Sequence, residues 1–321
     1  MPNRAVQADG GDAMLGRIAG AVRFKEPLSF HTSLRLGGPA EFFVVPRDLE
    51  DVRYALDFAD REELPVIVIG GGNNMLVSDC GVQAVVLKLQ GVLARAEFDG
   101  DRVLVGAGVS LSALIREAAA RDLGGLECLA GIPATIGGAL ATGAGTSEGS
   151  VMDLCSAVHF LHPDGTVGEF RQLEHAGGAQ TFDLPPGAIL LGCRMQLVRR
   201  AGPTTLKEIK RRLKLRKASE PFALASAGFV WKNPPGTLAE RLIDAVGLRG
   251  KRLNGAEISA KASNFIINRG GATQGDVVGL MEMTRERVEA RFAVTLQTEI
   301  RMLGFPAAAA FPSVPLELAA G

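Results

Sequence analysis

The chain has few residues of the kinds that build metal centres or disulfide frameworks. Its 321 residues include only four cysteines and four histidines. The cysteines are widely spaced, form no Cys-x-x-Cys pair, and match no pattern with the histidines or with carboxylates. They are Cys80, Cys128, Cys155 and Cys193. We therefore expect a reduced protein of the cytoplasm without a metal ion.

An excess of either charge is also missing. Lysine and arginine together number 35, as do aspartate and glutamate, so no net field attracts the chain to nucleic acid. No run of about 18 apolar residues is present that could span a membrane. The first residues also lack the charged-then-apolar pattern of a secretory signal. We expect no nucleic-acid partner and no membrane, and a small-molecule ligand instead.

Glycine, in contrast, is abundant and gathers in turns. Residues 70–74 are Gly-Gly-Gly-Asn-Asn and follow an apolar run, residues 65–69, that predicts a buried strand. Successive glycines leave backbone N–H groups open to an anion such as a phosphate. The turn lacks the glycine spacing of the dinucleotide fingerprint, and it is not a P-loop because no Gly-Lys-Ser/Thr follows it. Taken alone, a plain turn between two strands explains it equally well.

Further glycine-rich segments favour the ligand interpretation. Residues 130–139 place Pro133 and Thr135 ahead of a Gly-Gly pair, a composition that fits close approach of the backbone to a ligand. Tight helix packing or a flexible loop would give the same composition. Residues 105–109 and 31–40 supply two more glycine-rich turns. All four segments lie in the first half of the chain, and together they predict one extended cofactor.

Alternating strand and helix patterns predict an α/β (α+β) fold with boundaries near residues 92–100 and 200. A basic helix is expected from about Thr204 to Ser219, most of it a solvated face. A Thr-x-x-Asp spacing at Thr273 predicts the start of another helix. The predicted units are a flexible tail (1–20), a first subdomain (21–92), a second subdomain (93–200), a C-terminal domain (201–304) and a Pro/Ala-rich tail (305–321).

The order and spacing of these motifs over about residues 24–304 resemble one family, the UDP-N-acetylenolpyruvoylglucosamine reductases. The matching stretches are His31–Thr32, Gly37–Ala40, Gly70–Asn74, Leu76, Gly106–Gly108, Gly131–Pro133, Thr135, Gly137–Ala139, Ser226–Gly228, Lys232–Pro234, Ser259, Asn264–Ile266, Asn268, Gly270–Thr273 and Glu299. The resemblance implies a two-subdomain FAD-binding fold of the vanillyl-alcohol-oxidase/PCMH type, followed by a smaller α/β substrate domain. The single tyrosine, Tyr54, lies in the first predicted helix, so the shorter family variant without a tyrosine-bearing loop is the better match.

The resemblance also implies an activity. Family members use NADPH to reduce FAD, and then reduce UDP-N-acetylglucosamine enolpyruvate to UDP-N-acetylmuramate for peptidoglycan. This implies a cytoplasmic flavoprotein oxidoreductase of cell-wall biogenesis, linked to cell shape, the cell cycle and cell division, and a monomer or weak oligomer. The FAD-binding residues implied by the match are Gly70, Gly71, Gly72, Asn73, Asn74, Met75, Leu76, Gly106, Gly108, Gly131, Ile132, Pro133, Thr135, Ile136, Gly137, Gly138 and Arg216.

Other positions carry the family's substrate contacts and its catalysis. Lys232 and Asn233 match a substrate-binding segment, although Lys-Asn-Pro is equally compatible with a turn. Glu299, a catalytic carboxylate in the family, is retained. Phe229, however, stands where the family has the serine or cysteine that donates a proton, and a phenyl ring has no proton to give. Gln180 aligns with a charged arginine of the family.

These departures leave three functions open. Losing a general acid costs about 10²–10⁴ in rate, and losing an electrostatic donor costs about 10²–10³. The chain is an active reductase if Glu299 donates the proton instead, a role that an apolar site would favour by raising the pKa of its carboxyl group. It is otherwise a degenerate FAD- and UDP-sugar-binding paralogue that regulates or scaffolds. The third possibility is a flavin oxidoreductase of the same fold with another substrate.

Overall fold

The computed structural model describes residues 16–171 and 184–306. Its first sheet has the order β1-β2-β5-β3, with β1 antiparallel to β2, and with β2 and β3 both parallel to β5. The strands are β1 (Ala21–Pro27), β2 (Pro39–Val45), β5 (Val82–Lys88) and β3 (Val66–Ile69). The strand predicted ahead of the glycine turn is therefore confirmed as β3.

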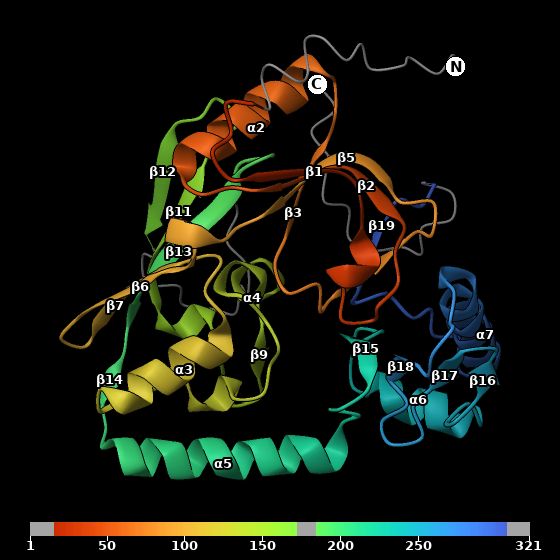
Figure 1. The fold of residues 1–321 in the computed structure, drawn as a ribbon. Coiled ribbons are helices and arrows are strands. Elements are labelled where there is room, and N and C mark those ends of the chain that lie inside the picture. The colour runs from red at the N-terminus through yellow and green to blue at the C-terminus, as the bar shows by residue number, and fades with distance from the viewer. Residues whose placement is uncertain (1–15, 172–183, 307–321) are drawn as a thin grey trace.

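Helix α2 (Leu49–Arg61) connects β2 to β3 and covers this sheet (Figure 1). It begins where the side chain of Asp48 accepts a hydrogen bond from the N–H of Asp51. Its apolar residues recur at helical spacing and pack against β2 and β5, which is why this segment is helical. They are Val52, Ala55, Phe58 and Ala59.

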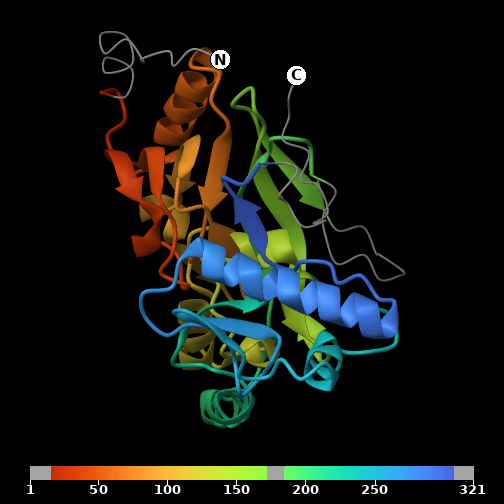
Figure 2. The same cartoon turned by 90° about the vertical axis from the view of Figure 1, so that its right-hand side faces the viewer.

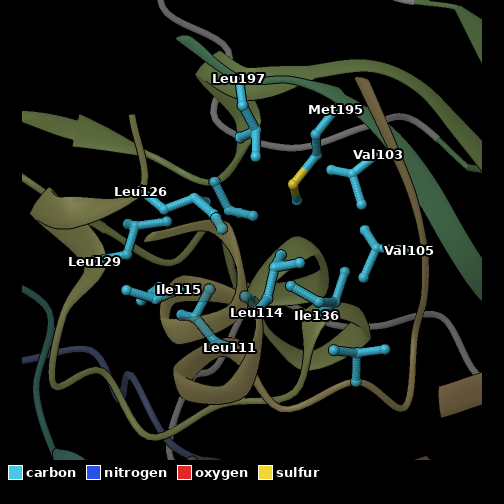
Figure 3. Packing of buried hydrophobic residues seen from close by; sticks show 14 of the residues in the cluster. Val103, Val105, Leu111, Leu114, Ile115, Leu126, Leu129, Ile136, Met195 and Leu197 are labelled. Atoms are coloured by element: carbon cyan, nitrogen blue, oxygen red, sulfur yellow. The ribbon is translucent and has the colours of Figure 1, made fainter. Parts of the chain in front are cut away.

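The second sheet is antiparallel throughout, in the order β12-β11-β13-β7-β6. Its elements are β12 (Val167–Arg171), β11 (Cys155–Leu161), β13 (Ile189–Gln196), β7 (Arg102–Gly106), β6 (Ala96–Asp99) and the helices α3 (Leu111–Ala120) and α4 (Ile136–Thr142). Figure 3 shows Val105 and Met195 from the strands facing Leu114 of α3 and Ile136 of α4 in one buried cluster. This core fixes α4 against the sheet.

Helix α5 (Gly202–Ser219) confirms the predicted basic helix. It runs as one long rod from the second sheet toward the C-terminal domain (Figure 1). Its buried residues are only Gly202, Thr205 and Ile209, so most of its surface is solvated. The shorter connecting elements are η1 (Leu28–Phe30), β4 (Met75–Val77), η2 (Gly91–Ala94), β8 (Leu123–Gly124), η3 (Glu127–Leu129), β9 (Gly145–Thr146), β10 (Gly149–Ser150), η4 (Met152–Leu154) and β14 (Val198–Arg199).

The C-terminal domain is built on an antiparallel sheet in the order β15-β18-β17-β16. Figure 2 shows α7 lying across this domain. As predicted, α7 begins at a capping box, in which Thr273 and Asp276 bond each other's backbone N–H groups. The elements are β15 (Ala225–Phe229), α6 (Ala239–Ala245), β16 (Arg252–Leu253), β17 (Ala256–Ile258), β18 (Phe265–Asn268) and α7 (Gln274–Phe292).

The last strand, β19 (Arg301–Leu303), does not join the C-terminal sheet but pairs in parallel with β4. Leu76 of β4 is fully buried among side chains of the C-terminal domain. The amide of Asn268 also donates to the carbonyl of Leu34 at 3.0 Å. The C-terminal domain is thus joined to the first part of the chain, next to the glycine turn.

Part of the predicted N-terminal tail is packed rather than flexible. Ile18 is buried in the cluster beneath α2, and the N–H groups of Ala19 and Gly20 donate to the carboxylate of Asp51 at 2.8 Å. The sequence did not indicate this role for Asp51, because an acidic residue in the first turn of a helix usually faces solvent. The remainder of both predicted tails lies outside the described residues. No helix within the described ranges is long and apolar enough to cross a membrane.

Candidate active site

A large cavity, about 2620 Å³, opens where the glycine turn, α4 and the C-terminal domain meet. Residues 70–75 form part of its wall, and residues 131–135 form another part. The end of β15 and the residues just before and within β19 complete the wall on the C-terminal side. The cavity therefore joins segments that are far apart in the sequence.

The glycine turn is shaped to receive an anion. The N–H groups of Gly71, Gly72 and Asn73 donate no hydrogen bond to any other described residue. Gly72 has φ +65°, and a Cβ there would lie 2.0 Å from the carbonyl oxygen of His31. Free donors on a turn with no room for a side chain fit the pyrophosphate of a group such as FAD.

The two main glycine motifs touch each other. A Cβ on Gly70 would lie 2.3 Å from the hydroxyl oxygen of Thr135, so only glycine allows this approach. The hydroxyl of Thr135 in turn accepts a hydrogen bond from the N–H of Gly138 at 3.2 Å and caps α4. The structure therefore brings these two motifs to one site, as the sequence predicted.

Some of the glycines are also required by tight packing. The N–H of Gly137 donates to the carbonyl of Ala107 at 2.8 Å, and a Cβ on Gly137 would lie 2.8 Å from that of Ala107. A Cβ on Gly106 or Gly108 would lie 2.3 Å from a carbonyl oxygen of the segment after β5. Close packing therefore requires glycine at these three positions, and Gly108 and Gly137 line the cavity as well.

Asn74 ties the glycine turn to the C-terminal residues. Its amide donates to the carbonyl of Glu299 at 3.2 Å, while its own carbonyl accepts from the N–H of Arg301 at 3.0 Å. Ser33 makes a second tie, since its hydroxyl lies 2.6 Å from the carbonyl of Ser226 and 3.1 Å from that of Gly72. These bonds hold Glu299 and the end of β15 beside the turn.

Replacing Asn74 with alanine should lower the free energy of unfolding by about 1 kcal/mol, because one interdomain hydrogen bond is lost. It should also weaken FAD binding, since the turn loses its anchor. Urea unfolding and flavin titration would measure the two effects. Asn268→Ala is the control for a lost interdomain tie outside the cavity wall, although it also removes the bonds that the Asn268 side-chain carbonyl accepts from Gly270 and Ala272. FAD binding that falls equally in both variants would contradict the role given to Asn74.

Most of the predicted cofactor residues line the cavity. Those that line it are Gly70, Gly71, Gly72, Asn73, Asn74, Met75, Gly108, Gly131, Ile132, Pro133, Thr135, Gly137, Gly138 and Arg216. Leu76, Gly106 and Ile136 do not line it, and Leu76 and Ile136 are fully buried in cores. A motif match could not separate these residues, because core and site residues alternate along the same segments.

The two predicted substrate residues also lie off the cavity wall. The side chain of Asn233 accepts from the N–H of Ala239 at 3.0 Å, so it satisfies the first turn of α6. The positive charge of Lys232 lowers the pKa of the Glu299 carboxyl and so offsets part of the rise that burial causes. The turn interpretation of Lys-Asn-Pro thus accounts for Asn233. Gln180 lies outside the described residues.

Glu299 and Phe229 both face the cavity. Burial raises the pKa of the Glu299 carboxyl, and the charge of Lys232 opposes this only in part. Phe229 is 47% exposed, and its ring centroid lies 4.9 Å from that of Phe265 on the paired strand. A carboxyl group with a raised pKa therefore lines a cavity in which Phe229 replaces a hydroxyl or thiol.

Arg301 lines the same cavity and was not predicted from the sequence. Burial lowers the pKa of its guanidinium, yet this group has no hydrogen bond or ion pair with any described residue. In contrast, Arg216 is bound to Glu220 at 2.9 Å. The sequence signal that could have identified Arg301 is its spacing from Glu299. Side chains two residues apart on an extended segment face the same way, and Glu299 precedes Arg301 by two residues.

Two family models match the chain. The first, an FAD binding domain, covers residues 40–171. The second, the C-terminal domain of UDP-N-acetylenolpyruvoylglucosamine reductase, covers residues 220–303. Fold and site together define an FAD-binding oxidoreductase with a separate C-terminal domain.

Relatives that match over nearly the whole chain identify the family within this class. Reductases of that name from Pelobacter propionicus and Moorella thermoacetica are 39% and 40% identical, over 89% and 88% of this chain and 97% and 93% of theirs. The solved reductase from Thermus caldophilus superposes with a TM-score of 0.77 at 36% identity, covering 88% of this chain and 99% of that chain. The chain belongs to the UDP-N-acetylenolpyruvoylglucosamine reductase family. The resemblance, the predicted fold class and FAD as the cofactor are confirmed.

Proposed function

We propose that the chain is an FAD-dependent, NADPH-using reductase of unsaturated carboxylates, with Glu299 as the proton donor. Its expected substrate is the one that the relatives' name describes, UDP-N-acetylglucosamine enolpyruvate. The observation that carries this proposal is the placement of Glu299, whose carboxyl pKa is raised, in the same cavity as the glycine turn. A neutral carboxyl at working pH is what a general acid requires.

The chemistry divides between the cofactor and the chain. When bound, FAD would be held at the glycine turn and would supply the hydride chemistry by which NADPH reduces the β-carbon of the substrate. Glu299 protonates the α-carbon, where the electron pair of the broken double bond collects. Arg301 stabilises the negative charge that grows on the adjoining carboxylate, in place of the family's arginine at position 180. Phe229 adds apolar surface to the cavity that Glu299 lines, and an apolar site favours the protonated carboxyl.

The biological setting follows from this proposal. The product would be UDP-N-acetylmuramate, which places the chain in peptidoglycan precursor synthesis in the cytoplasm, as a monomer or weak oligomer. Residues 21–92 and 93–200 would hold FAD, and residues 201–304 would bind the substrate. Support comes from the curated relatives, which match over nearly their whole length.

A second candidate is a paralogue that binds FAD without turnover. The observation that favours it is Phe229 at the position of the proton donor, together with Gln180 at that of the arginine. Both losses fall on the reducing half, whereas the glycine turn and its free N–H groups are intact. Such a protein would regulate or scaffold peptidoglycan synthesis.

An anaerobic half-reaction separates the two candidates. The FAD-loaded protein is reduced with NADPH, UDP-N-acetylglucosamine enolpyruvate is added, and the flavin absorbance is followed. Reoxidation within the time of a normal turnover, about 0.1 s for a typical enzyme, supports the reductase. A flavin that stays reduced supports the paralogue. A protein that takes up no FAD would refute both.

A further inference from the structure

Helix α5 carries a row of three lysines on its outer face. Lys207, Lys210 and Lys214 are exposed and follow one another at spacings of three and four residues, so they lie in line along the helix. None of them has an ion-pair partner among the described residues. Like charges at this spacing repel, so the row destabilises its own helix. The arginines of α5 differ, because each is paired with a glutamate: Arg211 with Glu208, Arg212 with Glu148 and Arg216 with Glu220.

Helix α7 carries a row of the opposite charge. Glu282, Glu286 and Glu289 are exposed and lie in line at spacings of four and three residues. No ion pair joins any of the three to another residue that the structure describes, and Glu289 accepts a hydrogen bond from the hydroxyl of Thr295 at 2.9 Å. Both helices thus keep like charges side by side, without a counter-charge from the described part of their own chain.

The two rows match when the helices run antiparallel. The spacing along α5 is three and then four residues, and the spacing along α7 read backward is also three and then four. Each row covers about 10 Å of helix, at a rise of about 1.5 Å per residue. An antiparallel arrangement also brings opposite ends of the two helix dipoles together. The three pairs are Lys207 with Glu289, Lys210 with Glu286 and Lys214 with Glu282.

The two rows lie on different sides of the molecule, so they can meet only between two copies. Figure 1 shows α5 along the lower edge and α7 at the right, and Figure 2 shows α7 across the side that then faces the viewer. We propose that the chain associates with a second copy of itself through these rows, with α5 of one copy against α7 of the next. The two surfaces differ, so the contact is heterologous. It uses one helix from each copy, which makes the association weak and sensitive to salt. The rows lie outside the cavity, and the contact does not depend on the reductase chemistry.

Sedimentation velocity of the FAD-loaded protein tests this contact. At low salt the average mass of the wild type should rise with concentration, and at about 1 M salt, where the Debye length is about 3 Å, it should return to that of one chain. Lys210→Glu puts like charges at the centre of the contact and should weaken association by about tenfold, and so should Glu286→Lys. Lys251→Glu is the matched control, because Lys251 is an exposed lysine outside α5 with no ion pair to any described residue. It should associate as the wild type does.

Exchanging the two charges gives a sharper readout. A mixture of Lys210→Glu with Glu286→Lys should associate as the wild type does, because each contact between the two variants again joins opposite charges. A chain with both substitutions should also regain self-association. FAD uptake should be unchanged in every variant, which shows that each one is folded.

Three results would overturn the inference. The first is a wild type that stays monomeric at low salt up to its highest soluble concentration. The second is an association that both single variants leave intact, and the third is a charge exchange that fails to restore it. Each of these results leaves the proposed reductase standing, because that function is tested by reoxidation of the flavin.

Discussion

Replacing Glu299 with glutamine should slow reoxidation of the reduced flavin by about 10²–10⁴, the usual contribution of a general acid. Glutamine has nearly the same shape and can still donate a hydrogen bond, but it cannot give up a proton. FAD affinity should not change, because the tie from Asn74 uses the backbone carbonyl of Glu299. Stopped-flow absorbance under anaerobic conditions would measure the rate.

The control is Glu41→Gln, which neutralises a half-buried carboxylate on β2 outside the cavity. It should reoxidise at the wild-type rate. An unchanged rate in Glu299→Gln would mean that water or another group supplies the proton, and that the raised pKa of Glu299 serves no catalytic step.

The same substitution has a pH signature with a definite sign. Burial raises the pKa of Glu299 above its ordinary value of 4.5. The wild-type reoxidation rate should therefore fall as pH rises through that raised pKa, because the acid form disappears. Ionising the buried carboxyl also penalises the folded state, so stability drops over the window from 4.5 up to the raised pKa. Glu299→Gln should lack both effects, and thermal melting at several pH values would show the second.

The glycine motifs were the most predictable part of the site. Taken alone, the turn of three glycines was equally compatible with a plain turn, but together with the segment around Thr135 it predicted one site, and the structure brings the two segments into contact. The sequence could not tell which glycines meet a ligand and which meet backbone. Gly106 and Gly137 both look like ligand positions, yet each is fixed by a neighbouring carbonyl or methyl group. That distinction depends on contacts between distant segments.

The catalytic end was harder to predict for a related physical reason. Phe229 was placed at the site by its motif, and it does line the cavity. Arg301 carries no motif signal of its own, and its proposed role rests on its burial with no partner among the described residues. Burial of a charge is a tertiary property, set here by the parallel pairing of β19 with β4, which are more than 200 residues apart. Local sequence contains no record of that pairing.

Replacing Gly72 with alanine should abolish FAD binding and destabilise the chain. Alanine at φ +65° costs about 1–2 kcal/mol in the left-handed region. Its Cβ would also lie 2.0 Å from the carbonyl oxygen of His31, which is backbone and cannot rotate away. Overpacking of this kind typically adds about 1–3 kcal/mol. The turn must then shift, and its free N–H groups lose the alignment that a pyrophosphate needs.

Gly100→Ala separates the cost of a left-handed backbone conformation from the cost of a steric clash. Gly100 has φ +61° in the turn between β6 and β7, but a Cβ there would have nothing within 4 Å. The free energy of unfolding of this variant should fall only by the cost of the left-handed backbone, about 1–2 kcal/mol. The variant should bind FAD as the wild type does. Urea unfolding and flavin fluorescence titration would compare the two variants. If Gly72→Ala bound FAD normally, the cofactor would have to be held by contacts other than the backbone N–H groups of the glycine turn.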